Sequence, residues 1–253
     1  MKTIAIYNRK GGTGKTVTAG NTAVELARYG RVLIVDCDSQ ADLSGWISTG
    51  ARYELAEVLG AAVDLGAAAI SIRPNLDLLA SFALGGELQQ FAETQLHKNP
   101  FAFSNLRRDA EALGYDYMML DLAPAHSLLE RYALGIADSV ILVAQAEQFS
   151  RDAIELAQSF IVDIRRTMGA TADVVAIVAN RVNRTYAEHE AVLEILEALG
   201  YPVYVVGQST GISNAIAAGA FAREQYAGNP WLRTYQRLAE GLVNGEHQTA
   251  VSA

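Results

Sequence analysis

The sequence predicts an α/β protein with a mainly parallel, twisted sheet covered by helices on both faces. Short runs of β-branched and apolar residues alternate with longer amphipathic stretches, which is the pattern of repeated βαβ units. Several of these runs are apolar almost throughout, as expected for strands covered on both sides. The chain has 253 residues, of which 51% are hydrophobic and 19% charged. This composition supports a large core and excludes a disordered or low-complexity chain.

The predicted elements follow one another in a regular order. The first strand leads directly into a glycine-rich loop and a helix over 16–29, which ends at Gly30. Two later helices, over 149–168 and 188–199, also end before a glycine. A last helix is expected over 231–243. The predicted strands occupy residues 3–8, 31–36, 76–80, 117–121, 139–144, 174–179 and 203–206.

The chain reads as one domain over residues 1–243 with a polar tail over 244–253 that we expect to be frayed. It contains no internal repeat and no linker rich in glycine and serine. The single cysteine, Cys37, cannot form an internal disulfide, and the four histidines lack metal-ligand spacing. No apolar run approaches the roughly 20 residues that span a membrane. We therefore expect a cytoplasmic location and no membrane partner.

The loop over residues 9–16 reads R-K-G-G-T-G-K-T between a predicted strand and a helix. Its glycines allow backbone amides to curl around phosphate oxygens, and the start of the helix adds a positive dipole. Lys15 supplies a mobile cation, and Thr16 offers a hydroxyl to Mg²⁺, which bridges the outer phosphates of ATP. The usual pattern has glycine where Arg9 stands. We nevertheless predict a single-domain P-loop NTPase.

Two other interpretations of this loop are weaker. A purely structural glycine-rich turn has no need for two lysines and three glycines in this order. A Rossmann dinucleotide site would account for Asp36 at the end of the next strand. That site requires glycine or alanine at position 17, where Val17 stands, and it has no use for Lys15.

Two predicted strands end in carboxylates, at the edge of a parallel sheet where ligands bind. Asp36 and Asp38 alternate along an extended segment, so both are expected on one side, where they can hold Mg²⁺ or its waters and orient an attacking water. Asp121 fits the carboxylate that contacts Mg²⁺ through water. A single such aspartate is most often a cap or turn former. Three of them after a phosphate loop indicate a metal site, while Cys37 is expected to point into packing.

Lys10 lies five residues before Lys15, and this loop resembles the deviant phosphate loop of the ParA/MinD superfamily. The similarity to ParA-type partition ATPases continues through residues 32–40, 74–80 and 215–219. The resemblance implies an ATP-dependent sandwich dimer with weak, partner-stimulated ATP hydrolysis, in which Lys10 reaches the partner's nucleotide. It also implies that Asp38 takes part in hydrolysis and that Asn180 faces the adenine.

The sequence departs from the family pattern near the loop. Val17 replaces a second threonine and leaves only its backbone N–H for the α-phosphate. The residues predicted to bind nucleotide are Lys10, Gly11, Gly12, Thr13, Gly14, Lys15, Thr16, Val17 and Asn180. Those predicted to act in catalysis are Lys10, Lys15, Asp36 and Asp38, and those predicted to hold Mg²⁺ are Thr16, Asp38 and Asp121.

The formal net charge of −8 argues against coating nucleic acid by bulk charge. The resemblance nevertheless implies non-specific binding of double-stranded DNA by a face of the closed dimer. Apart from the two loop lysines the chain has only Lys2 and Lys98, so arginines must provide this face. Any one arginine cluster is explained as well by ordinary surface ion pairs. The candidates in the C-terminal half are Arg165, Arg166, Arg223, Arg233 and Arg237.

The predicted function is therefore a Mg-ATP-dependent dimerising ATPase that partitions or positions DNA, such as a plasmid or chromosome, or another intracellular cargo. The resemblance implies a ParB-like adaptor protein and association with the nucleoid in the ATP state. The helix over 231–243 lacks the basic amphipathic tail that MinD relatives insert into membranes. Two alternatives stay open. One is a nucleotide-gated DNA-processing or cargo-positioning switch with little turnover, and the other is a small-molecule kinase or synthetase of the same fold, against which Lys10 counts.

Overall fold

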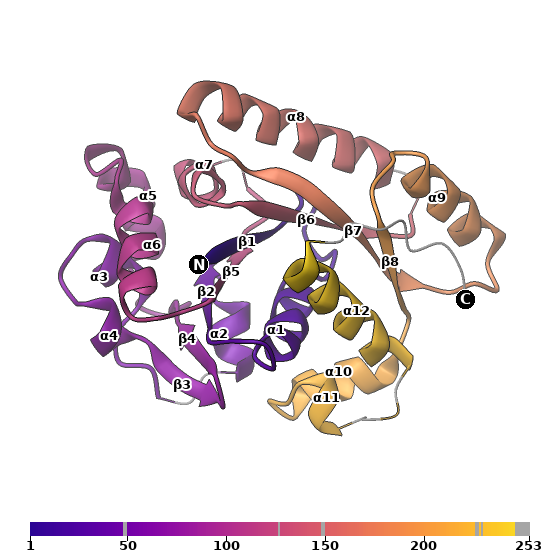
Figure 1. Cartoon of the computed structure of the whole chain (residues 1–253), viewed down its shortest axis with the longest axis horizontal. Coiled ribbons are helices and arrows are strands. Elements are labelled where there is room, and N and C mark those ends of the chain that lie inside the picture. The colour runs from indigo at the N-terminus through magenta and orange to yellow at the C-terminus, as the bar shows by residue number, and fades with distance from the viewer. Residues whose placement is uncertain (48–49, 126, 148–149, 226–227, 229, 246–253) are drawn as a thin grey trace.

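The computed structural model describes residues 1–47, 50–125, 127–147, 150–225, 228 and 230–245. These residues form one eight-stranded sheet in the order β3-β4-β2-β5-β1-β6-β7-β8, in which only β3 and β4 pair antiparallel (Figure 1). The strands are β1 (Lys2–Tyr7), β2 (Val32–Cys37), β3 (Ile70–Arg73), β4 (Leu76–Leu79), β5 (Tyr117–Leu122), β6 (Ser139–Gln145), β7 (Asp173–Val182) and β8 (Val203–Gly207). The predicted fold class is confirmed.

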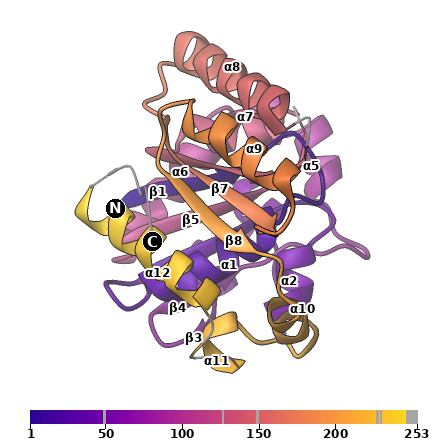
Figure 2. The same ribbon diagram turned by 90° about the vertical axis from the view of Figure 1, so that its right-hand side faces the viewer.

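The two faces of the sheet bury separate cores, because side chains alternate along each strand. Within β1, Ala5 and Tyr7 point into one core and Ile4 and Ile6 into the other. Figures 1 and 2 show α8 and α12 on opposite sides of the sheet. The first core is covered by α3 (Leu55–Leu59), α4 (Leu65–Ala68), α5 (Leu88–Thr94), α6 (Ala102–Ala112), α7 (Leu128–Gly135), α8 (Ser150–Met168) and α9 (Ala187–Glu197). The second is covered by α1 (Lys15–Leu26), α2 (Asp42–Ile47), α10 (Thr210–Ala217), α11 (Ala222–Gln225) and α12 (Pro230–Asn244).

All seven predicted strands are present, and the structure adds β3 at one edge. This strand has only four residues, and none of its side chains is fully buried, so its sequence lacks the apolar run that marks the other strands. It reaches β4 through a tight turn in which Asn75 adopts a φ of 60°. A short edge strand of this kind is recognisable only once its partner is known.

The helix predicted over 149–168 is observed as α8, although Phe149 lies outside the described residues. At the C-terminus, α12 ends at Asn244. The predicted tail is described only as far as Gly245. Among the described helices, none has the length and apolar character that crossing a bilayer requires.

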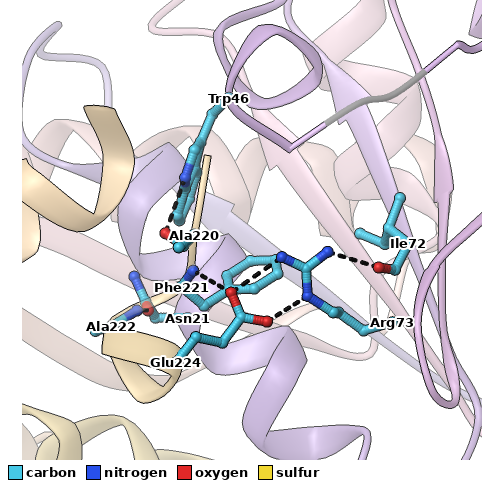
Figure 3. A network of polar contacts seen from close by, with 8 residues as sticks. All are labelled: Asn21, Trp46, Ile72, Arg73, Ala220, Phe221, Ala222 and Glu224. Carbon is cyan, nitrogen blue, oxygen red and sulfur yellow. Dashed lines mark hydrogen bonds and ion pairs between the residues drawn. The ribbon is translucent and has the colours of Figure 1, made fainter. Parts of the chain in front are cut away.

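A polar network attaches the segment before α12 to the rest of the second core (Figure 3). Arg73 of β3 forms a two-point ion pair with Glu224 of α11, and its Nη2 donates to Oε2 of Glu224 at 3.0 Å. The guanidinium also lies over the Phe221 ring, 5.2 Å from its centroid. On the other side, the indole Nε1 of Trp46 donates to the carbonyl of Ala220 at 3.2 Å. The turn over 220–224 is therefore held by β3 and α2 together.

Glu224→Gln is expected to lower the free energy of unfolding by about 1 kcal/mol at pH 7, since the pair with Arg73 is partly screened by solvent. Hydrogen bonding to Arg73 holds the pKa of Glu224 below its ordinary value. A carboxylate with a lowered pKa stabilises the fold above its unfolded-state pKa and loses that contribution as the pH falls through its folded-state pKa. Urea denaturation should show the difference at pH 7 and lose it near about pH 3.

The matched control is Glu240→Gln, which neutralises an exposed glutamate of α12. It should leave the unfolding free energy within about 0.5 kcal/mol of the parent value. Equal effects of the two substitutions, or a Glu224→Gln effect that persists in acid, would contradict the role assigned to the ion pair.

Candidate nucleotide-binding site

The glycine-rich loop joins the end of β1 to the start of α1 in the conformation that phosphate binding requires. Gly12 and Gly14 adopt positive φ angles of 72° and 97°, which only glycine adopts without strain. Gly14 is also the N-cap residue of α1, and no side chain caps this helix. A Cβ on Gly14 would clash with Nδ2 of Asn180. The uncapped helix start leaves its amides for an anion.

Side chains from the neighbouring strands hold the loop from one side. Nδ2 of Asn8 donates to the carbonyl of Val143 at 2.7 Å. From β6, Nε2 of Gln145 donates to the carbonyl of Gly12 at 2.6 Å. From β7, Nδ2 of Asn180 donates to the carbonyl of Thr13 at 2.9 Å. The carbonyls of Gly12 and Thr13 thus accept hydrogen bonds from side chains of the neighbouring strands.

The last of these contacts changes the role expected for Asn180. The family resemblance implies that this side chain faces the adenine, whereas here it is buried and braces the loop through Thr13. Arg181, the next residue, has a φ of 56°, and the pairing of β7 with β8 shifts register just there. Asn180 thus contacts the loop, and its position facing the adenine stays a prediction.

Lys15 lies under the loop with only 6% of its surface exposed. Its Nζ donates to the carbonyl of Lys10 at 3.2 Å. Burial lowers the pKa of Lys15, while the carboxylates of Asp121 and Asp38 act in the opposite direction. A desolvated ammonium with one weak backbone contact is suited to pairing with phosphate oxygens.

Asp121, near the end of β5, is 1% exposed, and neither carboxylate oxygen has a partner with good hydrogen-bond geometry among the described residues. Burial raises its pKa well above the ordinary range and the nearby charge of Asp36 adds to the effect, whereas the Thr16 hydroxyl and the Lys15 ammonium act against it. A buried carboxyl beside Lys15 and the hydroxyl of Thr16 suits a cation site. Mg²⁺ keeps waters and phosphate ligands and needs few protein ligands, so these residues fit it.

Asp121→Asn is expected to stabilise the ligand-free chain in EDTA by about 1–3 kcal/mol at pH 7, because it removes an unsatisfied buried carboxylate. Burial raises the pKa of this carboxyl in the folded chain above its value in the unfolded chain. Between the two pKa values the folded chain binds more protons, so the free energy of unfolding falls as the pH rises through that range. The advantage of the variant should therefore vanish as the pH is lowered toward about 4. Chemical denaturation across this range tests it, and an advantage independent of pH would contradict the explanation.

Asp36 and Asp38 are two residues apart, but their carboxylates differ in burial and in hydrogen-bond partners. Oδ2 of Asp36 accepts hydrogen bonds from the N–H and hydroxyl of Ser44 at 2.8 and 2.7 Å, and its Oδ1 accepts one from the N–H of Asp38 at 3.2 Å. Burial raises the pKa of Asp36 to about 6. Asp38 is only half-buried, and its Oδ1 accepts from the N–H of Gln40 at 2.9 Å.

The role of Asp36 in orienting the attacking water stays a prediction. Its carboxylate oxygens are engaged by Ser44 and Asp38, so it positions the start of α2 and the backbone of Asp38. Asp38 remains the carboxylate available to a ligand. Cys37, between them, is fully buried in the first core, as predicted.

Lys10 lies at the outer edge of the loop, with 41% of its side chain exposed, and forms an ion pair with Glu147 beyond the end of β6. Within a single chain, Lys10 is therefore paired with a carboxylate of that same chain.

Gln145 and Glu147 were not among the residues predicted from the sequence. They could have been found in the same way as the aspartates, because polar residues at or just beyond the carboxyl end of a parallel strand lie where ligands bind.

The candidate DNA-binding arginines divide into two groups. Arg223 is engaged by the fully buried Glu25 through two contacts of 2.6 Å, and its role in DNA binding stays a prediction. Arg165 pairs with Asp173 at 3.3 Å, and Arg166 pairs with Asp163 at 3.2 Å. Arg233 and Arg237 are exposed one turn apart on α12 and form no ion pair within the described part of the chain.

A cavity of about 590 Å³ opens at the carboxyl ends of β7 and β8. Its lining includes the polar residues Asn183, Gln208, Ser209 and Thr210 and the charged residue Arg184. The glycine-rich loop leaves β1 at the same edge of the sheet.

The chain is similar to known proteins over most of its length. Residues 1–174 match the family described as AAA domain. The chromosome partitioning protein ParA of Caulobacter vibrioides is 30% identical over 266 residues, covering 100% of this chain and 98% of that protein.

Solved structures share the fold. The complex of a Cyanothece McdA variant with ATP covers 100% of this chain and 99% of its own, with a TM-score of 0.84 and 19% identity. The cobyrinic acid a,c-diamide synthase of Mycobacterium smegmatis with bound ADP and magnesium covers 100% of both chains, with a TM-score of 0.81 and 19% identity. The fold alone therefore does not separate partition proteins from synthetases, but the sequence match does. The chain belongs to the AAA-domain family of P-loop ATPases that includes the ParA-type partition proteins.

Proposed function

We propose that this protein is a Mg²⁺- and ATP-dependent dimerising ATPase that positions DNA, or another cargo carried on DNA, inside the cell. The observation that carries the proposal is the pair of lysines in one preformed phosphate loop. Lys15 lies buried beneath the loop, and Lys10 lies exposed at its edge. A phosphate loop that acts within a single subunit needs only the buried lysine, Lys15.

The chain offers a residue for each role in ATP binding. The amides of the loop and of the start of α1 hold the phosphates, and Lys15 pairs with the β- and γ-phosphates. Thr16 and Asp121 would hold Mg²⁺, which when bound would neutralise charge on the outer phosphates. Relatives of the same fold support these cofactors, since one binds ATP and another ADP with magnesium.

Asp38 orients the water that attacks the γ-phosphate, and Asp36 keeps Asp38 in place through its backbone N–H. Lys10 completes the site of the partner subunit in the dimer. Because Lys10 is engaged by Glu147 in the single chain, hydrolysis by the isolated protein is slow, and a ParB-like adaptor raises it. A turnover measurement with and without adaptor and DNA distinguishes this ATPase from a switch that hardly hydrolyses ATP.

The DNA-binding face includes Arg233 and Arg237. With ATP, binding to non-specific double-stranded DNA should weaken steeply with salt. Replacing both arginines with alanine is expected to lower the slope of log K against log salt by about 2, since each phosphate contact contributes roughly 1. Electrophoretic mobility shifts over a salt series, with and without ATP, give this slope.

The control replaces Arg165 and Arg166, which already pair with Asp173 and Asp163. It removes the same charge from the chain but is expected to change the slope less. Binding that needs no ATP, or equal slopes for both double variants, would overturn the assignment of the DNA face to α12. Association with the nucleoid in the ATP state follows from the same property.

A further inference from the structure

The long helix α8 has an exposed face that is not explained by the nucleotide site. It packs on β6 and between α7 and α9, and Figures 1 and 2 both show it on the outside of the molecule. Its inner side lies in the first core. The outer side carries five exposed residues spaced by three or four positions, which places them in one row along the helix. This row, the α8 stripe, consists of Asp152, Leu156, Ser159, Val162 and Arg166.

The middle of the α8 stripe suits contact with another helix. Leu156 and Val162 are 50% and 61% exposed, so covering them removes apolar surface from water. The hydroxyl of Ser159, between them, donates to the carbonyl of Glu155 in the same helix at 2.9 Å. Covering Ser159 therefore leaves no hydroxyl donor unsatisfied. A small side chain at this point also allows a second helix axis to approach closely.

The two ends of the α8 stripe carry opposite charges. Asp152 makes no salt bridge among the residues that the structure describes, because the neighbouring Arg151 pairs with Glu155 at 2.7 Å. Arg166 pairs with Asp163 at 3.2 Å within its own helix. Such exposed pairs contribute little, so Arg166 can exchange this partner for another carboxylate.

The α8 stripe is symmetric about Ser159. Leu156 and Val162 each lie three positions from it, and Asp152 and Arg166 each lie seven positions from it. An antiparallel copy of the helix therefore places each Asp152 opposite an Arg166, and each Leu156 opposite a Val162. A parallel copy would place like charges opposite one another. The stripe is thus complementary to itself in one orientation, as a two-fold interface requires, and antiparallel helix dipoles favour the same orientation.

We propose that the α8 stripe binds a second copy of this chain, by antiparallel packing of the two α8 helices across Ser159. The contact is separate from Lys10, which lies on the phosphate loop, and it needs no nucleotide. One helix pair buries less than the roughly 1,200–2,000 Å² of a stable interface, so single chains associate with a Kd on the order of 0.1–1 mM. In the ATP-dependent dimer proposed above, on which this last step rests, two stripes are present and the contact joins dimers into larger assemblies.

Sedimentation equilibrium of the full chain in EDTA, without nucleotide and up to about 1 mM, tests the contact. The parent protein should approach the mass of a dimer at the highest concentrations. Asp152→Arg and Arg166→Asp each place like charges opposite one another at both ends of the helix pair, so each should weaken association by at least about tenfold. The variant that carries both substitutions should associate like the parent, and so should an equal mixture of the two single variants. Only antiparallel pairing predicts both rescues.

Arg165→Asp is the matched control, because it reverses a charge next to Arg166 but outside the α8 stripe. It should associate like the parent protein, and circular dichroism should show that all variants keep their helices. A parent chain that stays monomeric would overturn the proposal and assign the stripe to a different protein partner. A double variant that does not regain association, or an equal loss in Arg165→Asp, would also overturn it. Since no nucleotide is present, these outcomes are independent of whether the chain binds ATP.

Discussion

Lys15→Ala is expected to weaken Mg-ATP binding by about 10- to 100-fold, the usual loss for a hydrogen bond to a charged group. Lys15 is almost fully buried under the loop, and within the described part of the chain its ammonium hydrogen-bonds to the carbonyl of Lys10 at 3.2 Å. Its interaction with the phosphates therefore takes place where water screens it little. Isothermal titration calorimetry with ATP and Mg²⁺ measures the loss directly.

Lys98→Ala is the matched control, since it removes an exposed lysine at the end of a short 3-10 helix. It should bind ATP like the parent protein. Circular dichroism should show that both variants keep their secondary structure. Parent-like ATP affinity in the Lys15 variant would mean that the loop does not hold the phosphates, and the proposed function would fall.

Lys10→Ala is expected to abolish ATP-dependent dimerisation while leaving ATP binding by the single chain within a few-fold of its parent value. The side chain of Lys10 lies at the edge of the loop, 41% exposed and paired with Glu147, and only its backbone carbonyl contacts Lys15. Its loss removes a cation from the phosphates of the second nucleotide, where repulsion between the two nucleotides is greatest. Light scattering with a non-hydrolysable ATP analogue should report a monomer.

Arg9→Ala provides a charge-matched control, because Arg9 is the exposed neighbour of Lys10 in the same loop. It also lowers the charge of the loop by one, yet it should leave ATP-dependent dimerisation intact. A Lys10 variant that dimerises like the parent protein would exclude the sandwich arrangement. Loss of the dimer in both variants would show that loop charge in general, and not Lys10, controls association.

Where expectation and structure differ, the difference lies in long-range pairing. The alternation of Asp36 and Asp38 predicts a common side for both, but the sequence does not show that Ser44 engages the first of them. Nothing in the sequence around Arg223 indicates its partner, yet it pairs with Glu25, 198 residues earlier. Such contacts depend on which helices pack against each other, and the pattern of neighbouring residues in the sequence does not show this.

The sequence by itself determined seven of the eight described strands, the phosphate loop and the carboxylates at the strand ends. These features follow from residue type at short spacing, because strand burial and loop conformation are set by neighbouring residues. Only the tertiary structure decided which charged groups are paired within the chain. It paired Lys10 with Glu147, 137 residues away, left both oxygens of Asp121 without a geometric hydrogen-bond partner among the described residues, and brought Trp231 to the cavity. The physical reason is that a side chain's charge and accessibility depend on the groups packed around it, and in a parallel sheet those groups come from distant parts of the chain.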